Sequence, residues 1–154
     1  MGISRSFAAA LIPVLIMVAA PSQAASPSWD EGKVISEATG GRFNNRAGSY
    51  FDKDCNQDTP YQNDVVDLNG DGQPEVFVTI HGTCWGGMTG VFLDLKIKGA
   101  DGKWTSQFGF PGVYQVLESK NKGYPDIEIG GPGFCFPIWR WNGQQYAIHK
   151  KCPQ

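Results

Sequence analysis

Short hydrophobic runs separated by turn-forming residues dominate the chain from Tyr61 onward. Most runs alternate apolar and polar positions with a period of two or consist of β-branched and aromatic residues, and Gly, Asn, Asp or Pro stands between them. This pattern is typical of β-strands, and the short separators favour antiparallel neighbours. It predicts strands over residues 64–68, 75–80, 91–98, 103–110, 113–118, 126–129, 134–141 and 144–150.

One helix is predicted before these strands. Ile35 and Ala38 share a helical face with Val34, Asp30 is suited to cap the N-terminus, and Gly40-Gly41 is suited to end the helix. Residues 42–60 are rich in Asn, Asp and Gly, so we expect an extended or looping segment there. The pattern therefore predicts a mainly β fold of antiparallel sheets with one short N-terminal helix.

Two segments resemble copies of one unit. Ten residues separate Pro74 from Cys84 and Pro125 from Cys135, and a Gly stands two residues before each Cys. After each Cys come an apolar strand, a tight turn and an aromatic strand. A repeat of about 40 to 50 residues built from antiparallel strands is typical of propeller-blade-like units or of two related sheets. Chance similarity within a Gly-rich β protein is the alternative.

The first 24 residues have the pattern of a signal peptide. Arg5 provides a positive charge, residues 8–20 form an apolar core, and Ser22-Gln23-Ala24 is a small-x-small cleavage signal. The apolar run is shorter than the roughly 18 to 20 residues that a membrane-spanning helix needs, which disfavours the alternative of a membrane anchor. We expect a signal peptide over 1–24, a single β-rich domain over 25–154, and a periplasmic or secreted protein with no membrane anchor.

Composition limits the classes of partner. The 154 residues include 13 Lys and Arg against 15 Asp and Glu, a net charge of −2, and no basic cluster is longer than Lys150-Lys151. An electrostatic grip on nucleic acid or acidic lipid is therefore not expected. The 20 Gly and 10 Pro argue against a helical bundle, because both residues are costly inside helices.

The four cysteines predict two disulfides in an oxidising compartment. A metal site using His81 and Cys84 is the alternative, but the cysteines lack the paired spacing of a zinc site. Asn142-Gly143 predicts a two-residue hairpin that sets Cys135 diagonal to Cys152. Of the three possible pairings, we therefore prefer Cys135 with Cys152 and Cys55 with Cys84.

A loop between two predicted strands carries the clearest chemical signal. Oxygen-bearing side chains stand at its positions 1, 3, 5 and 9, a Gly stands at position 6, and position 7 offers a main-chain carbonyl. This spacing suits calcium, and we expect one structural ion. The alternative is an Asp/Asn/Gly hairpin whose side chains cap its own backbone without metal. The predicted ligands are Asp67, Asn69, Asp71, Gln73 and Glu75.

This loop is not an EF-hand, but it resembles another calcium loop. Val78 stands where an EF-hand needs a bidentate Glu, and a β-branched run follows where that motif needs a helix. Residues 64–80 instead resemble the calcium loop of FG-GAP or VCBS-type repeats, the blade units of integrin-like β-propellers. The resemblance implies the same five ligands. The Gly-Ala-Pro signature of FG-GAP repeats is absent, and Lys120 and Lys122 occupy ligand positions in the second copy.

Catalytic patterns are scarce. The chain has no Gly-x-Ser-x-Gly elbow and no His-Glu-x-x-His motif, and its only imidazoles are His81 and His149. We therefore expect a protein that is not an enzyme. A hydrolase that uses a pair of carboxylates is the alternative, although nothing in the sequence positions such a pair.

Two Gly-rich loops are candidate contact surfaces for a protein partner. Their glycines allow close approach, and Trp, Met and Phe are typical interface anchors. Disulfides at Cys84 and Cys135 would hold both loops rigid. In the alternative, the aromatic side chains belong to the core and the glycines only make turns. The candidate partner-binding residues are Trp85, Gly86, Gly87, Met88, Gly131, Pro132, Gly133 and Phe134.

In size, export and strand content, the chain is similar to the periplasmic immunity proteins that protect bacteria against type VI secreted peptidoglycan amidases. The resemblance implies an inhibitor that plugs the active site of a cell-wall hydrolase. A calcium-dependent adhesion or surface module is the alternative.

Overall fold

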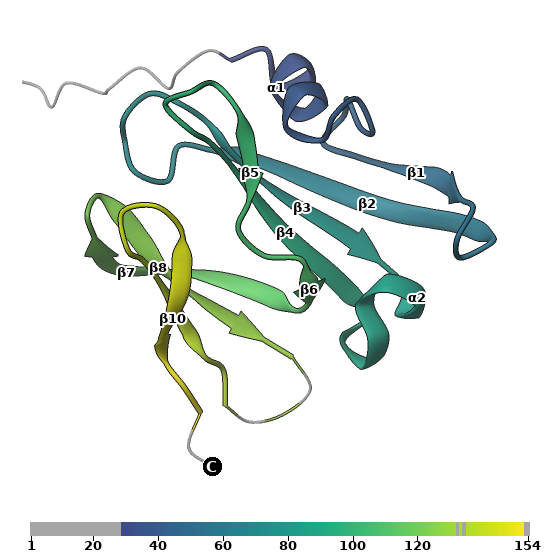
Figure 1. Cartoon of the computed structure of the whole chain (residues 1–154). Coiled ribbons are helices and arrows are strands. Elements are labelled where there is room, and N and C mark those ends of the chain that lie inside the picture. The colour runs from purple at the N-terminus through teal and green to yellow at the C-terminus, as the bar shows by residue number, and fades with distance from the viewer. Residues whose placement is uncertain (1–28, 132, 134, 153–154) are drawn as a thin grey trace, which may run out of the picture.

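The computed structural model of the chain describes residues 29–131, 133 and 135–152 (Figure 1). The predicted signal peptide therefore lies outside the described residues. Two antiparallel sheets and two short helices make up the fold, which confirms the predicted mainly β class. The helical elements are α1 (Glu31–Ala38), α2 (Thr83–Gly86) and the 3-10 turn η1 (Gly87–Thr89).

The larger sheet, sheet A, has the strand order β1-β2-β3-β4-β5, and β6 also pairs with β4. Sheet B has four strands in the order β10-β9-β8-β7, and neither of these linear orders closes into a barrel or propeller. The strands of sheet A are β1 (Ala47–Asp52), β2 (Gln57–Val66), β3 (Glu75–His81), β4 (Val91–Lys98), β5 (Trp104–Ser106) and β6 (Phe110–Pro111). Those of sheet B are β7 (Val113–Asn121), β8 (Tyr124–Gly130), β9 (Ile138–Trp141) and β10 (Tyr146–Lys150).

The N-terminal helix begins and ends as predicted. The Asp30 carboxylate accepts a hydrogen bond from the Lys33 backbone at 3.1 Å, which satisfies one of the free N–H groups of the first turn. Ile35 and Ala38 are buried. Gly40 and Gly41 follow with φ angles of 62° and 83°, a left-handed conformation that glycine adopts without strain.

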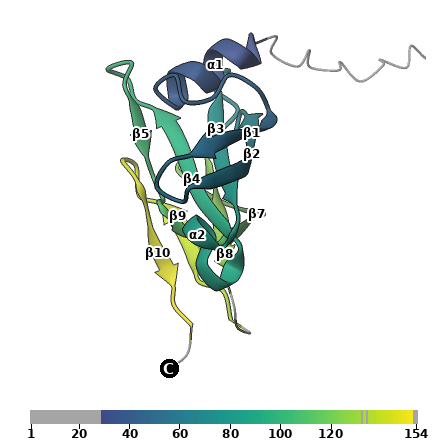
Figure 2. The ribbon, with the colours of Figure 1, turned by 90° about the vertical axis from the view of Figure 1, so that its right-hand side faces the viewer.

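The central strand β3 of sheet A is buried on both faces because it alternates its side chains between two cores. Val76 and Ile80 of β3 pack with Ile35 of α1 in one core. Phe77 packs in the other core, with Leu95 of β4 and Ile127 of sheet B. The molecule is therefore layered as helix, sheet and sheet, and Figure 2 shows α1 near one end and α2 toward the other.

The predicted repeat corresponds to two similar sheets. Strands β2-β3-β4-β5 form one antiparallel meander and β7-β8-β9-β10 form another, with sequential strands adjacent in both. In each meander a Pro-acid pair stands at the start of the second strand, and both acidic side chains, Glu75 and Asp126, are only 2% exposed. Both sheets therefore contain an open meander with a buried acid at the same place, and their origin as copies of one unit stays a prediction.

The extended or looping segment predicted over residues 42–60 contains β1 and the first four residues of β2, which the pattern did not predict as strands. Strand β2 does alternate between buried and exposed positions, but two of its inward residues are the polar Thr59 and Asn63. Asp52 of β1 is also buried. Hydrophobic patterning missed this hairpin since polar side chains fill its inner positions.

Other strand boundaries also differ from the prediction, and β9 begins at Ile138 where the pattern predicted a strand from residue 134. The range 103–110 is divided between β5 and β6, and the C-terminal hairpin has a four-residue loop over 142–145. Asn142 is the cause of the longer loop, because its side-chain oxygen accepts hydrogen bonds from the backbones of Gln144 and Gln145. Trp141 consequently pairs with Tyr146, which shifts the register by two residues from the prediction.

Both preferred disulfides are present. Cys55 is bonded to Cys84 and Cys135 to Cys152, with sequence separations of 29 and 17 residues. The first joins the β1-β2 turn to α2, and the second joins the segment after β8 to the end of β10. Each disulfide therefore fastens one of the Gly-rich loops to a segment next to a strand, the first to the β1-β2 turn and the second to the residues after β10.

We predict that each disulfide contributes about 3 kcal/mol to the free energy of unfolding, because each closes a loop of this length in the unfolded chain. Urea unfolding of the Cys55→Ser/Cys84→Ser and Cys135→Ser/Cys152→Ser variants measures the two contributions separately. Unfolding midpoints equal to that of the oxidised parent would contradict this expectation.

Candidate functional site

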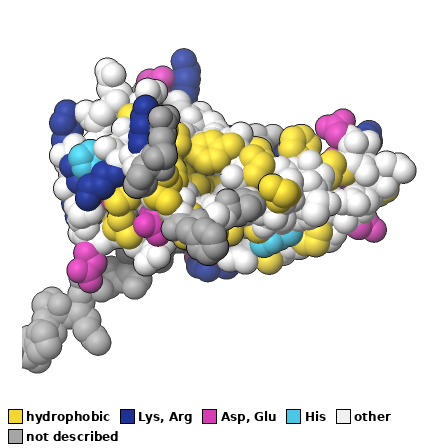
Figure 3. All heavy atoms as spheres, turned by 90° about the horizontal axis from the view of Figure 1, so that it is seen from below, with side chains coloured by type: hydrophobic (Ala, Val, Ile, Leu, Met, Phe, Trp, Pro, Cys, Tyr) yellow, Lys and Arg dark blue, Asp and Glu magenta, His cyan; other side chains and the backbone are white. Residues whose placement is uncertain are grey.

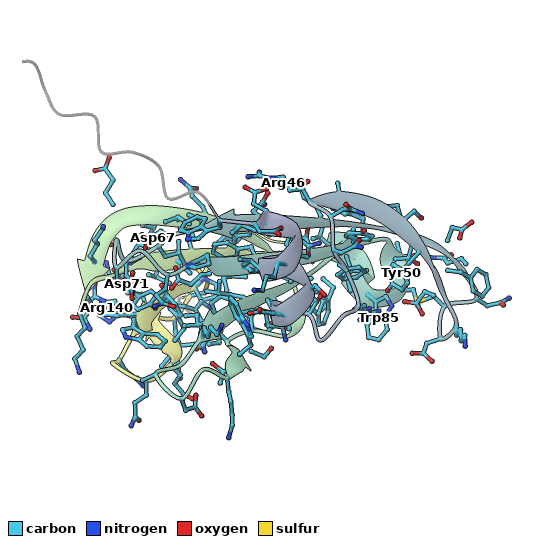
Figure 4. The ribbon with its side chains drawn as sticks, turned by 90° about the horizontal axis from the view of Figure 1, so that it is seen from above. Arg46, Tyr50, Asp67, Asp71, Trp85 and Arg140 are labelled. Atoms are coloured by element: carbon cyan, nitrogen blue, oxygen red, sulfur yellow. A yellow bond between two sulfur atoms is a disulfide. The ribbon has the colours of Figure 1, made fainter. Side chains whose placement is uncertain are left out.

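The loop between β2 and β3 is closed by its own hydrogen bonds. The Asp67 carboxylate accepts from the backbones of Gly70 at 2.7 Å and Gly72 at 2.9 Å, and Asn69 accepts from the backbone of Asp71 at 2.9 Å. Asp71 in turn accepts from the backbone of Gln73 at 2.7 Å. Figure 4 shows Asp67 and Asp71 together at one end of the molecule. This is the geometry of successive Asx turns.

Glu75 is buried and hydrogen-bonded, whereas the other predicted ligands lie in the loop. It is 2% exposed, and its oxygens accept a hydrogen bond from the Leu68 backbone at 2.7 Å and one from the Tyr124 hydroxyl at 2.9 Å. Burial raises the pKa of Glu75 to about 7, these two hydrogen bonds offset part of the rise, and Asp71 and Asp67 add to it. Glu75 therefore links the loop to sheet B through Tyr124.

Calcium stays a prediction for this loop. Within the described part of the chain, no three His, Cys, Asp or Glu side chains converge as a metal centre would require. The loop does place Asp67, Asn69 and Asp71 in succession, with carboxylate and amide oxygens that suit a hard cation. Binding would require their oxygens to converge, with Gln73 offering its carbonyl and Glu75 leaving Tyr124 to join as the fifth predicted ligand.

Asp126, which stands in sheet B where Glu75 stands in sheet A, is bonded to a cation. Arg140 donates two hydrogen bonds to Asp126, at 2.9 and 2.7 Å, and Ser119 donates a third at 2.6 Å. The hydrogen bonds from Arg140 lower the pKa of Asp126, although burial opposes this. A cation thus balances the buried acid of sheet B, whereas Glu75 has neutral donors and two acidic neighbours.

Trp85, a predicted partner-binding residue, is turned inward. Its indole N–H donates to the Asp52 carboxylate at 2.6 Å, and its ring packs edge-on against Phe92. Tyr50 donates to the same carboxylate at 2.5 Å, and Figure 4 shows Tyr50 and Trp85 close together. Asp52 also accepts from the backbone of Cys55. Trp85 therefore holds the Cys84 loop to the β1-β2 hairpin.

The two Gly-rich loops lie side by side. A Cβ built on Gly131 would stand 3.5 Å from the Thr89 hydroxyl. Figure 3 shows the molecule from below, and hydrophobic side chains gather there in a band across the middle. We call the described residues of 83–90 and 130–137 the loop end.

The candidate residues of the loop end differ in exposure. Met88 is 92% exposed, and Gly87 and Gly133 are also exposed, both with positive φ. Gly86 is buried, and a Cβ there would collide with the Val91 backbone at 2.1 Å, so this glycine permits close packing. Gly131 is half-buried beside Thr89. Pro132 and Phe134 lie outside the described residues.

Sequence reasoning missed two exposed apolar residues near the loop end. Phe136 is 38% exposed, and its ring lies on Gly130, where an added Cβ would stand 3.0 Å from it. Val113, at the start of β7, is 50% exposed and lines the same hollow as Phe136. The position of Phe136 within a Gly-rich loop could have marked it as a contact residue. The exposure of Val113 depends on how β7 packs in the folded protein, which the sequence pattern does not show.

Comparisons with protein-family models, with curated proteins and with solved structures find no significant match to this chain.

We predict that calcium raises the melting temperature of the protein through the β2-β3 loop. A free calcium concentration ten times the dissociation constant stabilises the folded state by about 1.4 kcal/mol, which corresponds to a shift of a few degrees. The Asp67→Asn/Asp71→Asn variant keeps oxygen acceptors for the turns but loses two charges, so its shift should disappear. Differential scanning calorimetry in calcium, in magnesium and in chelator checks this, and identical melting curves for the parent would show a metal-free turn.

We predict that Asp52 makes the protein sensitive to acid. The hydrogen bond from Tyr50 is the largest cause that lowers the pKa of Asp52, to about 2. Because this pKa lies below the ordinary value of about 3.9, the stabilisation is complete above that value and is lost as the pH falls from about 4 to about 2.

Thermal unfolding between pH 7 and pH 2 measures this dependence. Asp52→Asn should unfold more easily at neutral pH but lose less stability on acidification than the parent. Asp54→Asn, a change to an exposed neighbour, is the control and should follow the parent. Parallel curves for Asp52→Asn and the parent would remove Asp52 from this role.

Proposed function

We propose that the mature chain is an exported protein-binding factor without enzymatic activity, and that it docks its partner through the loop end. The convergence of two disulfide-anchored loops that carry exposed Met88 and Phe136 is the observation that supports this most strongly. Large exposed apolar side chains that gather on one surface are typical of protein contact sites.

The construction of the loop end favours binding by a preformed surface. One disulfide and the Asp52–Trp85 hydrogen bond fasten the first loop, and Cys135–Cys152 fastens the second. A surface that is already ordered loses less conformational entropy when a partner binds. An inhibitor gains from this property, because a stiff projection can occupy a cleft without first having to fold.

The proposed partner is a peptidoglycan hydrolase, and the proposed role is that of an immunity protein or inhibitor that covers its active site. Two disulfides fit an oxidising compartment such as the periplasm or the exterior of the cell. No helix in the described residues is long and apolar enough to cross a membrane. The partner class itself rests on the resemblance in size, export and strand content.

We predict that Met88→Ser and Phe136→Ser weaken partner binding at least ten-fold each, since truncation of a central apolar anchor typically costs more than 1 kcal/mol. The tagged mature chain is used to isolate a partner from periplasmic extract, and calorimetry with the purified partner measures affinity and stoichiometry. A 1:1 complex that stops the partner's release of muropeptides is expected.

Ile148→Ser is the matched control, because it also removes an exposed apolar side chain. Ile148 is 47% exposed and lines a different hollow, with Arg140 and His149. Unchanged affinity in both loop-end variants, with a loss in the control, would contradict docking through the loop end. Binding to a surface ligand that disappears in chelator would instead favour a calcium-dependent adhesion module.

A further inference from the structure

Two hollows lie beside the loop end and share Val113 and Tyr114 of β7. The larger has a volume of about 290 Å³ and is also lined by Asp64, Thr79 and His81. The smaller has a volume of about 150 Å³ and is also lined by Glu128, Gly130 and Phe136. Each hollow thus combines one carboxylate with apolar surface, and we call the larger one the acidic cleft.

The acidic cleft exists because β7 covers only part of sheet A. The ring of Tyr114 stacks on Phe77 of β3, with centroids 3.8 Å apart, and its hydroxyl donates to the Asp64 carboxylate at 3.0 Å. Asp64 pairs with Phe77 across β2 and β3, and Gln62 pairs with Thr79 one step further along the same face. Beyond Tyr114 these polar residues form the floor of the cleft.

The hydrogen-bond donors to Asp64 within the described residues are all neutral. Besides Tyr114, the Gln62 amide donates to it at 3.0 and 3.2 Å. Burial raises the pKa of Tyr114, which therefore stays protonated as a donor. Among the ion pairs of the described residues, none involves Asp64 or Glu128.

Arg46, a cation in the neighbourhood of Asp64, is bonded to another carboxylate. Arg46 is close enough for Asp64 to contribute to the rise in its pKa, but its guanidinium donates two hydrogen bonds to Glu31, at 2.6 and 2.5 Å. His81 lies on the wall of the cleft next to Thr79, on the side away from Asp64 along β3. The half-buried charge of Asp64 is therefore without a bonded cation in the described part of the chain.

We propose that the acidic cleft receives an Arg or Lys side chain of the protein partner. This inference rests on the proposed function and names the partner chemistry that the cleft would select. The aliphatic stem of the basic side chain would lie along Val91 and Val113, and its charged head would reach Asp64. Glu128 in the adjoining hollow adds negative potential, so the pair of hollows favours a basic segment and repels an acidic one.

Butylguanidinium, which reproduces an Arg side chain, is the probe that tests this on the oxidised mature chain by 15N NMR titration. Saturable shifts are expected at the amides of Asp64, Val113 and Tyr114, with affinity about five-fold or more weaker in Asp64→Asn. Asn keeps the volume and can still accept the Tyr114 hydrogen bond, so this variant should stay folded. Glu118→Gln, which neutralises an exposed carboxylate near the other end of β7, is the control and should bind like the parent.

Equal shifts with neutral butyramide, or unchanged affinity in Asp64→Asn, would overturn the assignment of the cleft. The purified partner separates this inference from the proposed function. If Met88→Ser weakens the complex and Asp64→Asn does not, the loop end docks the partner and the cleft assignment is wrong. If butylguanidinium binds at Asp64 but neither loop-end variant affects the complex, the cleft assignment stands and docking through the loop end is wrong.

Discussion

Coverage of both faces of β3 is the constraint on which the rest of the structure depends. Six of its seven residues are buried, so this strand needs one layer against Val76 and Ile80 and another against Phe77. Helix α1 supplies the first layer and sheet B the second. Because sheet B covers only part of this face, uncovered polar residues remain beside its edge, and the acidic cleft lies at that boundary. The packing of the core thus determines where the acidic cleft lies on the surface.

The two meanders show how one strand arrangement accommodates a buried acid in two ways. In sheet B, Arg140 neutralises Asp126 directly, which keeps the acid ionised inside the protein. In sheet A, the donors to Glu75 among the described residues are Tyr124 and a backbone N–H, and burial favours its protonated form. The hydrogen bond from Tyr124 joins the sheets at the base of the acidic loop. Any rearrangement of that loop toward a cation would therefore be transmitted to the contact between the sheets.

Much of this fold could be predicted from sequence, because most core strands are short runs of apolar, β-branched or aromatic residues bounded by turn-forming residues. The helix cap at Asp30 was also predictable from local chemistry, and both disulfide pairings from export and the C-terminal hairpin, although the predicted register of that hairpin was wrong by two residues. The β1-β2 hairpin was not, since polar Thr59 and Asn63 fill its inner positions. In the candidate site, the exposure of Met88 could be expected because this residue lies in a Gly-rich loop. The inward turn of Trp85 depends on Asp52, 33 residues away, and the cleft depends on contacts 50 residues apart.

The separation of stabilising and contacting residues within the loop end has a consequence for its evolution. Trp85 and Gly86 are committed to Asp52 and to the Val91 backbone, so changes there would disturb the loop itself. Met88, Phe136 and Val113 are exposed, and their replacement leaves these internal contacts intact. A disulfide-held frame with replaceable contact residues can change its partner without changing its fold, because the frame and the contact surface depend on different side chains. For the inhibitor role that we propose, this independence would let the contact residues follow a changing target enzyme.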